Sequence, residues 1–335
     1  MDYTARERDA DFLMNDVFDV QKSWAEIEAY QELSSDLIKA VVAEGGRLAS
    51  EVMAPLNEVG DAHGCELKDG EVITPPGFKD AFAQLTQGGW LGLSGNPAFG
   101  GQGMPKSVAG LIEEMFWAAN SGLFLYGSLT VGACLSIDAH GSAEQKNTYL
   151  EKLYSGQWTG AMALTESHAG TDLGMMRTKA EPQADGSYNI TGTKIFITSG
   201  EHDMADNIVH LTLARIVDGP KGTKGISLFI VPKFLPNEDG SLGPRNGWAS
   251  GSLEHKMGIN GSATSVINYD GANGFLLGEE HQGLGAMFTM MNYERLSVGL
   301  QGLGAGDLAY QHSARYAQDR IQGRSATGAQ NPDAE

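Results

Sequence analysis

Apolar side chains in the first half of the chain recur at the three- and four-residue spacing of a helix. The clearest repeats are Leu33, Leu37, Val41 and Val42, followed by Phe78, Phe82 and Leu85. A Gly- and Pro-rich loop at 95–105 separates these repeats from candidate helices at 106–120, 122–140 and 143–154. The second of these helices is apolar all round, which is typical of a helix buried between others. We therefore expect an N-terminal helical domain over residues 1–155.

Beyond about residue 156 the pattern changes to that of β-strands. Runs rich in β-branched and aromatic residues, at 188–198 and 207–216 among others, are divided by turn signals such as Asp185-Gly186 and Asp239-Gly240. Short strands with such turns are typical of an antiparallel barrel or sandwich. We therefore predict a middle antiparallel β-barrel domain over residues 156–280.

After Gly283 the pattern becomes helical again. One long helix, Leu284–Ala317, is predicted by an apolar stripe at Met287, Met290, Met291, Leu296, Leu300 and Leu303. The predicted fold class is multidomain α and β, with residues 281–335 forming only the start of a C-terminal helical bundle. The apolar stripe of that helix then has too few partners, so we expect an incomplete chain.

The 335-residue chain has a formal net charge of −19, which narrows the classes of function. Phosphates repel such a surface, so we expect binding neither to nucleic acid nor to an anionic membrane. Two cysteines are too few for a disulfide framework, and the histidines lack metal-ligand spacing, so we expect no metal site. No apolar run reaches the roughly 18 residues of a membrane span, and the charged first residues do not form a secretory leader. These features predict a cytoplasmic protein.

The stretch Met162–Gly174 is the most informative part of the chain for chemistry. It reads MALTESHAGTDLG, a strand end that enters a loop of small residues with hydroxyls at Thr165 and Thr171. Such loops expose backbone N–H groups that bind anions or the polar edges of cofactors. A plain turn between strands has the same composition, so this loop alone leaves both interpretations open.

A second segment, KIFITSG, begins at Lys194. Phe196 and Thr198 lie two residues apart on one predicted strand and therefore share a face. On that face the Phe ring would lie beside a flat ring and the Thr hydroxyl would reach a ring heteroatom. The structural alternative is a core Phe and a surface Thr.

Taken together, these segments resemble the acyl-CoA dehydrogenase family, flavoproteins that desaturate acyl-CoA thioesters. The matching segments, in order, are LTE at 164–166, AGTD at 169–172, GTK at 192–194 and FIT at 196–198, with further matches at 95–105 and 316–323. The resemblance runs from about residue 30 to residue 324, and the ordered set is specific. The long N-terminus and the segments FITSGEHD and GFLLGEEHQGL resemble a longer branch that includes 3-(methylthio)propanoyl-CoA dehydrogenases.

The resemblance implies non-covalent FAD between the barrel and the C-terminal helices. By matching position, it implies that Met162, Leu164 and Thr165 contact the flavin ring edge, with Phe196 beside the flavin and Thr198 near its N5. It places Gly170 and Thr171 near the FAD diphosphate and the CoA portion of the substrate, and Arg295 near the CoA channel. It also implies that Arg320 and Gln322 reach the FAD of a neighbouring subunit. The implied partners are an acyl-CoA substrate and an electron-transferring flavoprotein, with a homodimer or homotetramer when the chain is complete.

Desaturation also needs a carboxylate that removes the α proton. In most of the family this carboxylate is a Glu beyond the position of residue 335. In a minority it is the residue just before the Arg that matches Arg295, and this chain has Glu294 at that place. We expect Glu294 to be solvated or paired with an Arg, and Glu166, Asp172 and Glu201 to be turn or surface groups. An acyl-CoA oxidase, or a non-catalytic flavin- or acyl-CoA-binding subunit or fragment without the base, is the alternative function.

Overall fold

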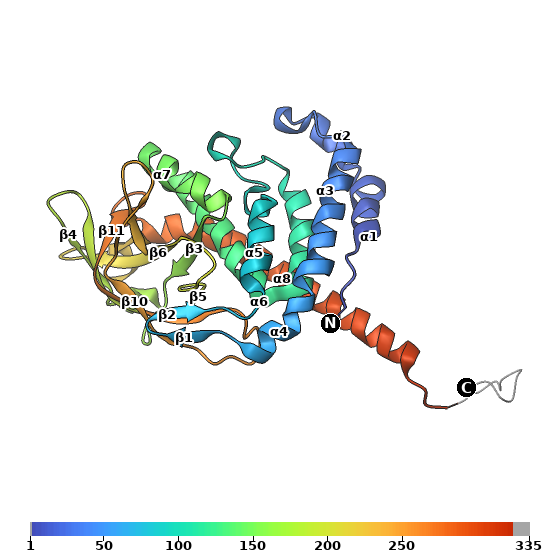
Figure 1. The fold of residues 1–335 in the computed structure, drawn as a ribbon. Coiled ribbons are helices and arrows are strands. Elements are labelled where there is room, and N and C mark those ends of the chain that lie inside the picture. The colour runs from blue at the N-terminus through green and yellow to red at the C-terminus, as the bar shows by residue number, and fades with distance from the viewer. Residues whose placement is uncertain (1, 324–335) are drawn as a thin grey trace, which may run out of the picture.

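The computed structural model describes residues 2–323 as a helical part, a strand-rich part and one long C-terminal helix (Figure 1). The helical part consists of α1 (Glu7–Phe12), α2 (Val20–Ala25), α3 (Ser35–Arg47), α4 (Pro55–His63), α5 (Phe78–Gln87), α6 (Lys106–His140) and α7 (Ala143–Tyr154). The expected helical character of the N-terminal part is therefore confirmed. A small hairpin interrupts it, with β1 (Glu66–Lys68) antiparallel to β2 (Glu71–Ile73).

The central element is α6, which bends where the sequence predicts two helices. Asn120 has non-helical torsions, φ −159° and ψ 87°, and its side-chain oxygen accepts a bond of 2.9 Å from the N–H of Leu123. This bond caps the second half of the helix. Although α6 is long and apolar enough to cross a bilayer, 72% of its most apolar window is buried inside the fold, so it is weak evidence for a membrane span.

The strand-rich part contains β3 (Trp158–Ala163), β4 (Lys179–Pro182), β5 (Tyr188–Thr198), β6 (Asn207–Ile216), β7 (Ile226–Pro232), β8 (Phe234–Pro236), β9 (Leu242–Arg245), β10 (Trp248–Leu253) and β11 (Thr264–Leu276). Seven of these form one sheet in the order β10-β11-β5-β4-β6-β3, and β7 pairs with both β11 and β6. The pairs β3–β6 and β4–β6 are parallel, and the β4–β6 and β7–β11 pairings are each two residue pairs long. The predicted strand-rich middle domain is confirmed, but its sheet is mixed rather than antiparallel, and the short pairings of β7 with β11 and of β4 with β6 do not make it a regular barrel.

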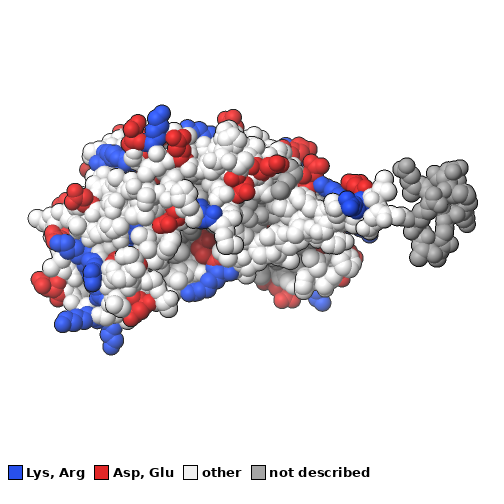
Figure 2. All heavy atoms as spheres, turned by 90° about the horizontal axis from the view of Figure 1, so that it is seen from below, with Lys and Arg blue, Asp and Glu red and all other residues white. Residues whose placement is uncertain are grey.

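The long helix α8 (Gly283–Asp319) lies across both parts and extends past the helical part at its C-terminal end (Figure 1). Met287 and Met290 are fully buried, in a core shared with α6, α7 and the sheet. Leu296 and Leu303, on the predicted apolar stripe, are exposed. Figure 2 shows acidic and basic side chains intermixed with uncharged ones on the face it presents, so the net charge is not gathered there.

Candidate functional site

The end of β3 and the loop that follows it lie against β5. The backbone N–H of Ile195 donates to the carbonyl of Thr165 over 2.9 Å. Behind β3, α6 approaches so closely that a Cβ on Gly160 would lie 2.4 Å from the Cβ of Ala133. The two segments with candidate cofactor contacts, 162–171 and 194–198, are therefore joined at this point. We call these two segments together the rim.

An ion pair between Lys194 and Glu166 fixes the rim. Lys194 Nζ is fully buried and donates to Glu166 Oε1 over 3.0 Å and to the carbonyl of Leu164 over 2.8 Å. Burial opposes ionisation of Glu166, but Lys194 and hydrogen bonds from Arg177 and Thr178 outweigh it and lower its pKa to about 2. Burial lowers the pKa of Lys194 to about 8 against the opposing effect of Glu166. Glu166 begins a turn, as expected, but its carboxylate is buried and ion-paired rather than a surface group.

Phe196 and Thr198 lie at the end of β5, where its pairing with β11 is irregular. Phe196 is 58% exposed, and its φ of 58° is left-handed, which is strained for a bulky residue that is not glycine. Thr198 is half-buried. An exposed aromatic ring in a strained backbone conformation is typical of a ligand-contact position rather than of a core residue.

The remaining rim residues differ in exposure. Leu164 is buried and Met162 half-buried, whereas Gly170 and Thr171 are exposed in the loop. The backbones of Glu166 and Ala169 bond to each other in both directions at 3.0 Å, which closes a tight turn just before Gly170. Asp172 is exposed and caps the next turn, as expected of a turn residue.

Glu294 is buried in the interface between α6 and α8, contrary to our expectation. Its side chain is 7% exposed, and Oε2 accepts from Ser128 Oγ over 3.0 Å, while Oε1 has no hydrogen-bond partner among the described residues. A Cβ on Gly132 of α6 would lie 2.6 Å from Oε1, so the carboxyl needs a glycine opposite it. Burial raises the pKa of Glu294 to about 8.

A second carboxyl group, which is only half-buried, lies beside this one. Glu113 accepts from Tyr293 Oη over 2.8 Å and from Ser297 Oγ over 3.1 Å, and burial raises its pKa. Ser297 Oγ lies 3.4 Å from Ser128 Oγ, which donates to Glu294. Each carboxyl group therefore has its own serine donor, and the oxygens of the two serines lie next to each other.

Arg295, Arg320 and Gln322, the residues on and after α8 that we expect near CoA or FAD, do not join the rim. Arg295 is exposed, bonds to Asn292 over 2.8 Å and lies over the Phe288 ring, rather than pairing with Glu294. Arg320 and Gln322 are exposed beyond the C-terminal end of α8. That end is roughly 37 Å along the helix axis from Glu294, on the side away from the sheet (Figure 1).

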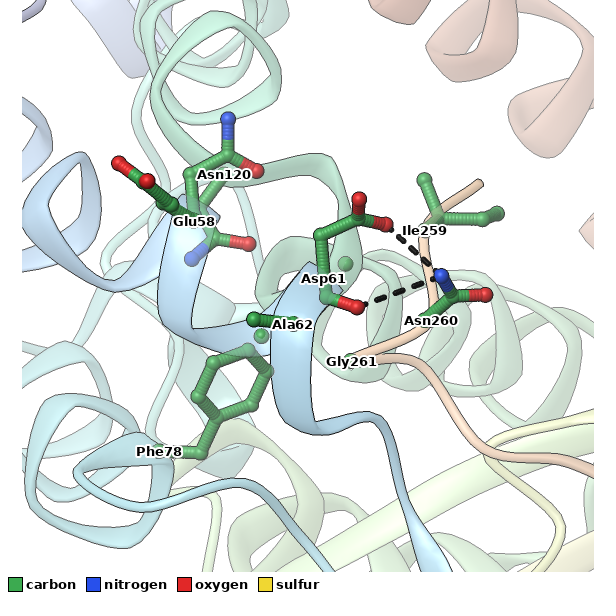
Figure 3. Close-up of a pocket in the computed structure, with 11 residues that line it drawn as sticks. Glu58, Asp61, Ala62, Phe78, Asn120, Ile259, Asn260 and Gly261 are labelled. Carbon is green, nitrogen blue, oxygen red and sulfur yellow. Dashed lines mark hydrogen bonds between the residues drawn. The ribbon is translucent and has the colours of Figure 1, made fainter. Parts of the chain in front are cut away.

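A cavity elsewhere contains none of the predicted site residues. It lies between α4, the bend of α6 and the loop before β11, with a volume of about 240 Å³ (Figure 3). Asn260 Nδ2 donates to Asp61 Oδ1 over 2.9 Å at its edge, and the Phe78 ring lines its base. The cavity is therefore separate from the rim.

Sequence reasoning missed the polar core behind β5. Glu201, expected at a turn or surface, is fully buried and paired with Lys233 over 2.7 Å. His202 and His210, which we call the buried histidine pair, are 1% or less exposed, and burial lowers their pKa values to about 3 and about 4. The apolar run around His210, IVHLTL, was a signal that this histidine is buried.

The chain matches two domain patterns of one family. Residues 39–157 match the pattern described as "Acyl-CoA dehydrogenase, N-terminal domain", and residues 161–272 match "Acyl-CoA dehydrogenase, middle domain". Both matched ranges together include the whole rim, the buried histidine pair and α6.

Individual relatives agree with these patterns. The chain is 45% identical, over 98% of its length and 56% of the relative, to 3-methylmercaptopropionyl-CoA dehydrogenase of Ruegeria pomeroyi. Its fold resembles butyryl-CoA dehydrogenase from Megasphaera elsdenii, with a TM-score of 0.72, 27% identity and coverage of 87% of this chain and 71% of that one. It also resembles an acyl-CoA dehydrogenase complexed with FAD from Bacillus anthracis, with a TM-score of 0.71, 28% identity and coverage of 87% and 46%.

The chain thus spans about half the length of the curated relative it matches. The two domain matches, the 45% identity and the shared fold agree with the order of the rim segments along the sequence. This protein belongs to the acyl-CoA dehydrogenase family.

Proposed function

We propose that this chain is the flavin- and substrate-binding part of an FAD-dependent dehydrogenase that places a double bond between Cα and Cβ of an acyl-CoA thioester. The observation that carries the proposal is the rim, in which residues 164–166 contact residues 194 and 195, directly before Phe196 and Thr198. The Ruegeria pomeroyi relative supports 3-(methylthio)propanoyl-CoA as the substrate. Electrons then pass to an electron-transferring flavoprotein, in the cytoplasm.

The residues of the rim fit a flavin. Phe196 offers an exposed aromatic ring, and Thr165 and Thr198 offer hydroxyl groups from the two adjoining segments. The exposed loop after the Glu166–Ala169 turn offers backbone N–H groups that suit a diphosphate. The residues that would hold FAD are Met162, Leu164, Thr165, Gly170, Thr171, Phe196 and Thr198, with Arg320 and Gln322 reaching the FAD of a neighbouring subunit in a dimer or tetramer.

When bound, FAD supplies the acceptor for the hydride that leaves Cβ. The chain's own contribution is orientation, because the Lys194–Glu166 pair holds the loop that carries Thr165 in one position against β5. Groups held in advance need no reorganisation during the reaction. Thr171 and Arg295 would contact the CoA portion of the substrate.

Glu294 is the proton acceptor that we propose within the described chain. It is buried, one of its oxygens has no partner among the described residues, and its pKa of about 8 lies near physiological pH, where a general base is most effective. The competing source is a Glu beyond residue 335. Glu294→Gln keeps the shape and removes the basic oxygen, so it should slow flavin reduction about 10²–10⁴-fold if Glu294 is the base.

The outer face of α8 supports the proposal that further helices complete the enzyme. Exposed apolar side chains on or beyond this helix include Phe288, Leu296, Val298, Leu303, Tyr310, Tyr316 and Ile321. Gly299 and Gly302 have nothing within 4 Å of an added Cβ, which leaves room for close helix packing. We propose that the C-terminal part of a complete bundle covers this face.

A steady-state assay tests the proposed activity. The full-length gene product, loaded with FAD, should oxidise 3-(methylthio)propanoyl-CoA with an electron-transferring flavoprotein as acceptor and show little turnover with O₂ alone. Equal turnover with O₂ would identify an oxidase. Butyryl-CoA, offered at the same concentration, tests the substrate assignment, since a higher kcat/KM for butyryl-CoA would reject it.

A further inference from the structure

The turn at 199–206 directly follows the rim and connects it to the rest of the molecule. It begins after Thr198 and leads into β6, and its residues Ser199, Glu201 and His202 are at most 1% exposed. Such burial is unusual for a surface turn, because buried backbone groups must find hydrogen-bond partners. The partners identify what this turn holds in place.

His210 fixes the start of the turn. A carbonyl oxygen only accepts, so His210 Nε2 carries the proton and donates to the carbonyl of Gly200 over 2.7 Å. Its Nδ1 then accepts from Tyr269 Oη over 2.8 Å. The N–H of Ser199 donates to the carbonyl of Ala263 over 2.8 Å. The two residues after Thr198 are thus held from two directions.

His202 joins the turn to the other half of the rim. Its Nδ1 accepts from the N–H of Met204 over 3.2 Å, so Nε2 carries the proton and donates to Thr159 Oγ1 over 2.8 Å. Thr159 lies on β3, the strand whose end supplies residues 162–165 of the rim. The ring of His202 also meets the Tyr126 ring of α6 edge-on, with centroids 5.0 Å apart.

The turn also contacts the helical part. Asp203 accepts from Thr74 Oγ1 over 2.7 Å and pairs with Lys79 over 2.8 Å. These contacts are needed because the backbone beside Thr198 is strained, with left-handed φ values of 58° at Phe196 and 57° at Ser199. Strained residues persist only where their surroundings hold them.

We infer that His202 and His210 are positioning residues, which hold the β5 half of the rim at a fixed place relative to the β3 half. Through Thr159 and Gly200 they keep Phe196 and Thr198 beside Thr165. The predicted effect on FAD binding rests on the proposed function, whereas the predicted effect on the position of the rim backbone does not.

Hydrogen exchange measured by mass spectrometry tests this inference in the full-length gene product. Thr159→Val deletes the hydroxyl that accepts from His202, with little change in shape. This variant can be measured even if His202→Ala does not fold. Loss of one buried hydrogen bond predicts roughly tenfold faster exchange of the amides at 195–200. His202→Gln keeps an N–H donor, so this variant should retain most of the protection that the unsubstituted protein shows at 195–200.

Ser136→Ala is the matched control, because it removes a buried hydroxyl bonded to a backbone carbonyl, that of Ala286, on the α6–α8 interface. It should leave exchange at 195–200 unchanged. If Thr159→Val gives no local increase, or only the general increase that Ser136→Ala gives, the inference is overturned.

FAD titration of the same variants supplies the second measurement. Thr159→Val should raise the Kd for FAD by roughly the same tenfold and shift the flavin absorption band, whereas Ser136→Ala should change neither. An unchanged Kd and band in Thr159→Val would overturn the role in positioning. If the unsubstituted protein binds no FAD, the proposed function fails, and the exchange measurement still decides whether the histidines hold the rim.

Discussion

Replacing Glu294 by Gln should remove a large pH dependence of the stability. The pKa of this carboxyl is raised from 4.5 to about 8 in the folded protein, so the folded state binds more protons than the unfolded state between these values. The free energy of unfolding of the unsubstituted protein therefore falls as pH rises from about 4.5 to about 8 and then levels off. Since each pKa unit corresponds to 1.36 kcal/mol, the contribution lost is about 5 kcal/mol.

Gln stays neutral at every pH, so it avoids this loss. The amide can still accept from Ser128, but its NH₂ group faces the position near Gly132 where Oε1 has no partner among the described residues. Any loss of unfolding free energy from burying that NH₂ group is the same at all pH values, because the amide does not ionise. The difference in unfolding free energy between Glu294→Gln and the unsubstituted protein, and not its absolute value, should therefore rise by about 4 kcal/mol between pH 5 and pH 9, because the rest of the loss occurs below pH 5.

Urea unfolding followed by tryptophan fluorescence at pH 5, 6, 7, 8 and 9 measures this difference. Glu113 is present in both proteins and contributes to both curves. Glu151→Gln, at an exposed position on α7, is the control and should run parallel to the unsubstituted protein. Parallel curves for Glu294→Gln and the unsubstituted protein would refute the assignment of a buried, proton-holding carboxyl.

The other predictions concern the rim and the core behind it. Thr165→Val and Thr198→Val should each weaken FAD binding by roughly 0.5–1.5 kcal/mol, measured by titration, and unchanged affinity in both would remove these residues from the site. Lys194→Met should lower the unfolding free energy by about 3–5 kcal/mol, because it leaves Glu166 charged, buried and unpaired, whereas Lys179→Met, at an exposed pair, should cost under about 1 kcal/mol. Because both pKa values of the buried histidine pair are lowered, its contribution to stability is present above pH 6.5 and should be lost as the pH falls towards 4 and 3. Thermal unfolding between pH 7 and pH 4 measures this loss, and a His202→Gln variant should show a smaller one.

Local signals predicted the elements well, because they depend on neighbours in sequence. The break at Asn120 and the strand 188–198 follow from side-chain pattern and local capping. The Asp69-Gly70 pair was a usable hairpin signal for β1 and β2, since both residues have positive φ. The parallel pairing of β3 with β6 has no such local signal, because these strands are joined through a long intervening chain.

The rim was predictable as a set of residues, but its supporting charges were not. Glu166 and Glu201 are buried because lysines 28 and 32 residues away in sequence reach them, and sequence spacing does not reveal such partners. Glu294 was expected to be solvated or paired with an Arg, yet consecutive residues on a helix point in different directions. Arg295 therefore faces solvent while Glu294 faces α6.

The most direct test of the proposed function is anaerobic mixing of the FAD-loaded, full-length gene product with 3-(methylthio)propanoyl-CoA. The account predicts that the flavin absorption band bleaches within the turnover time and that an oxidised electron-transferring flavoprotein restores it. A stable oxidised flavin band in the presence of this substrate and of butyryl-CoA, with both ligands shown to bind, would contradict the proposal that the protein is an acyl-CoA dehydrogenase in activity.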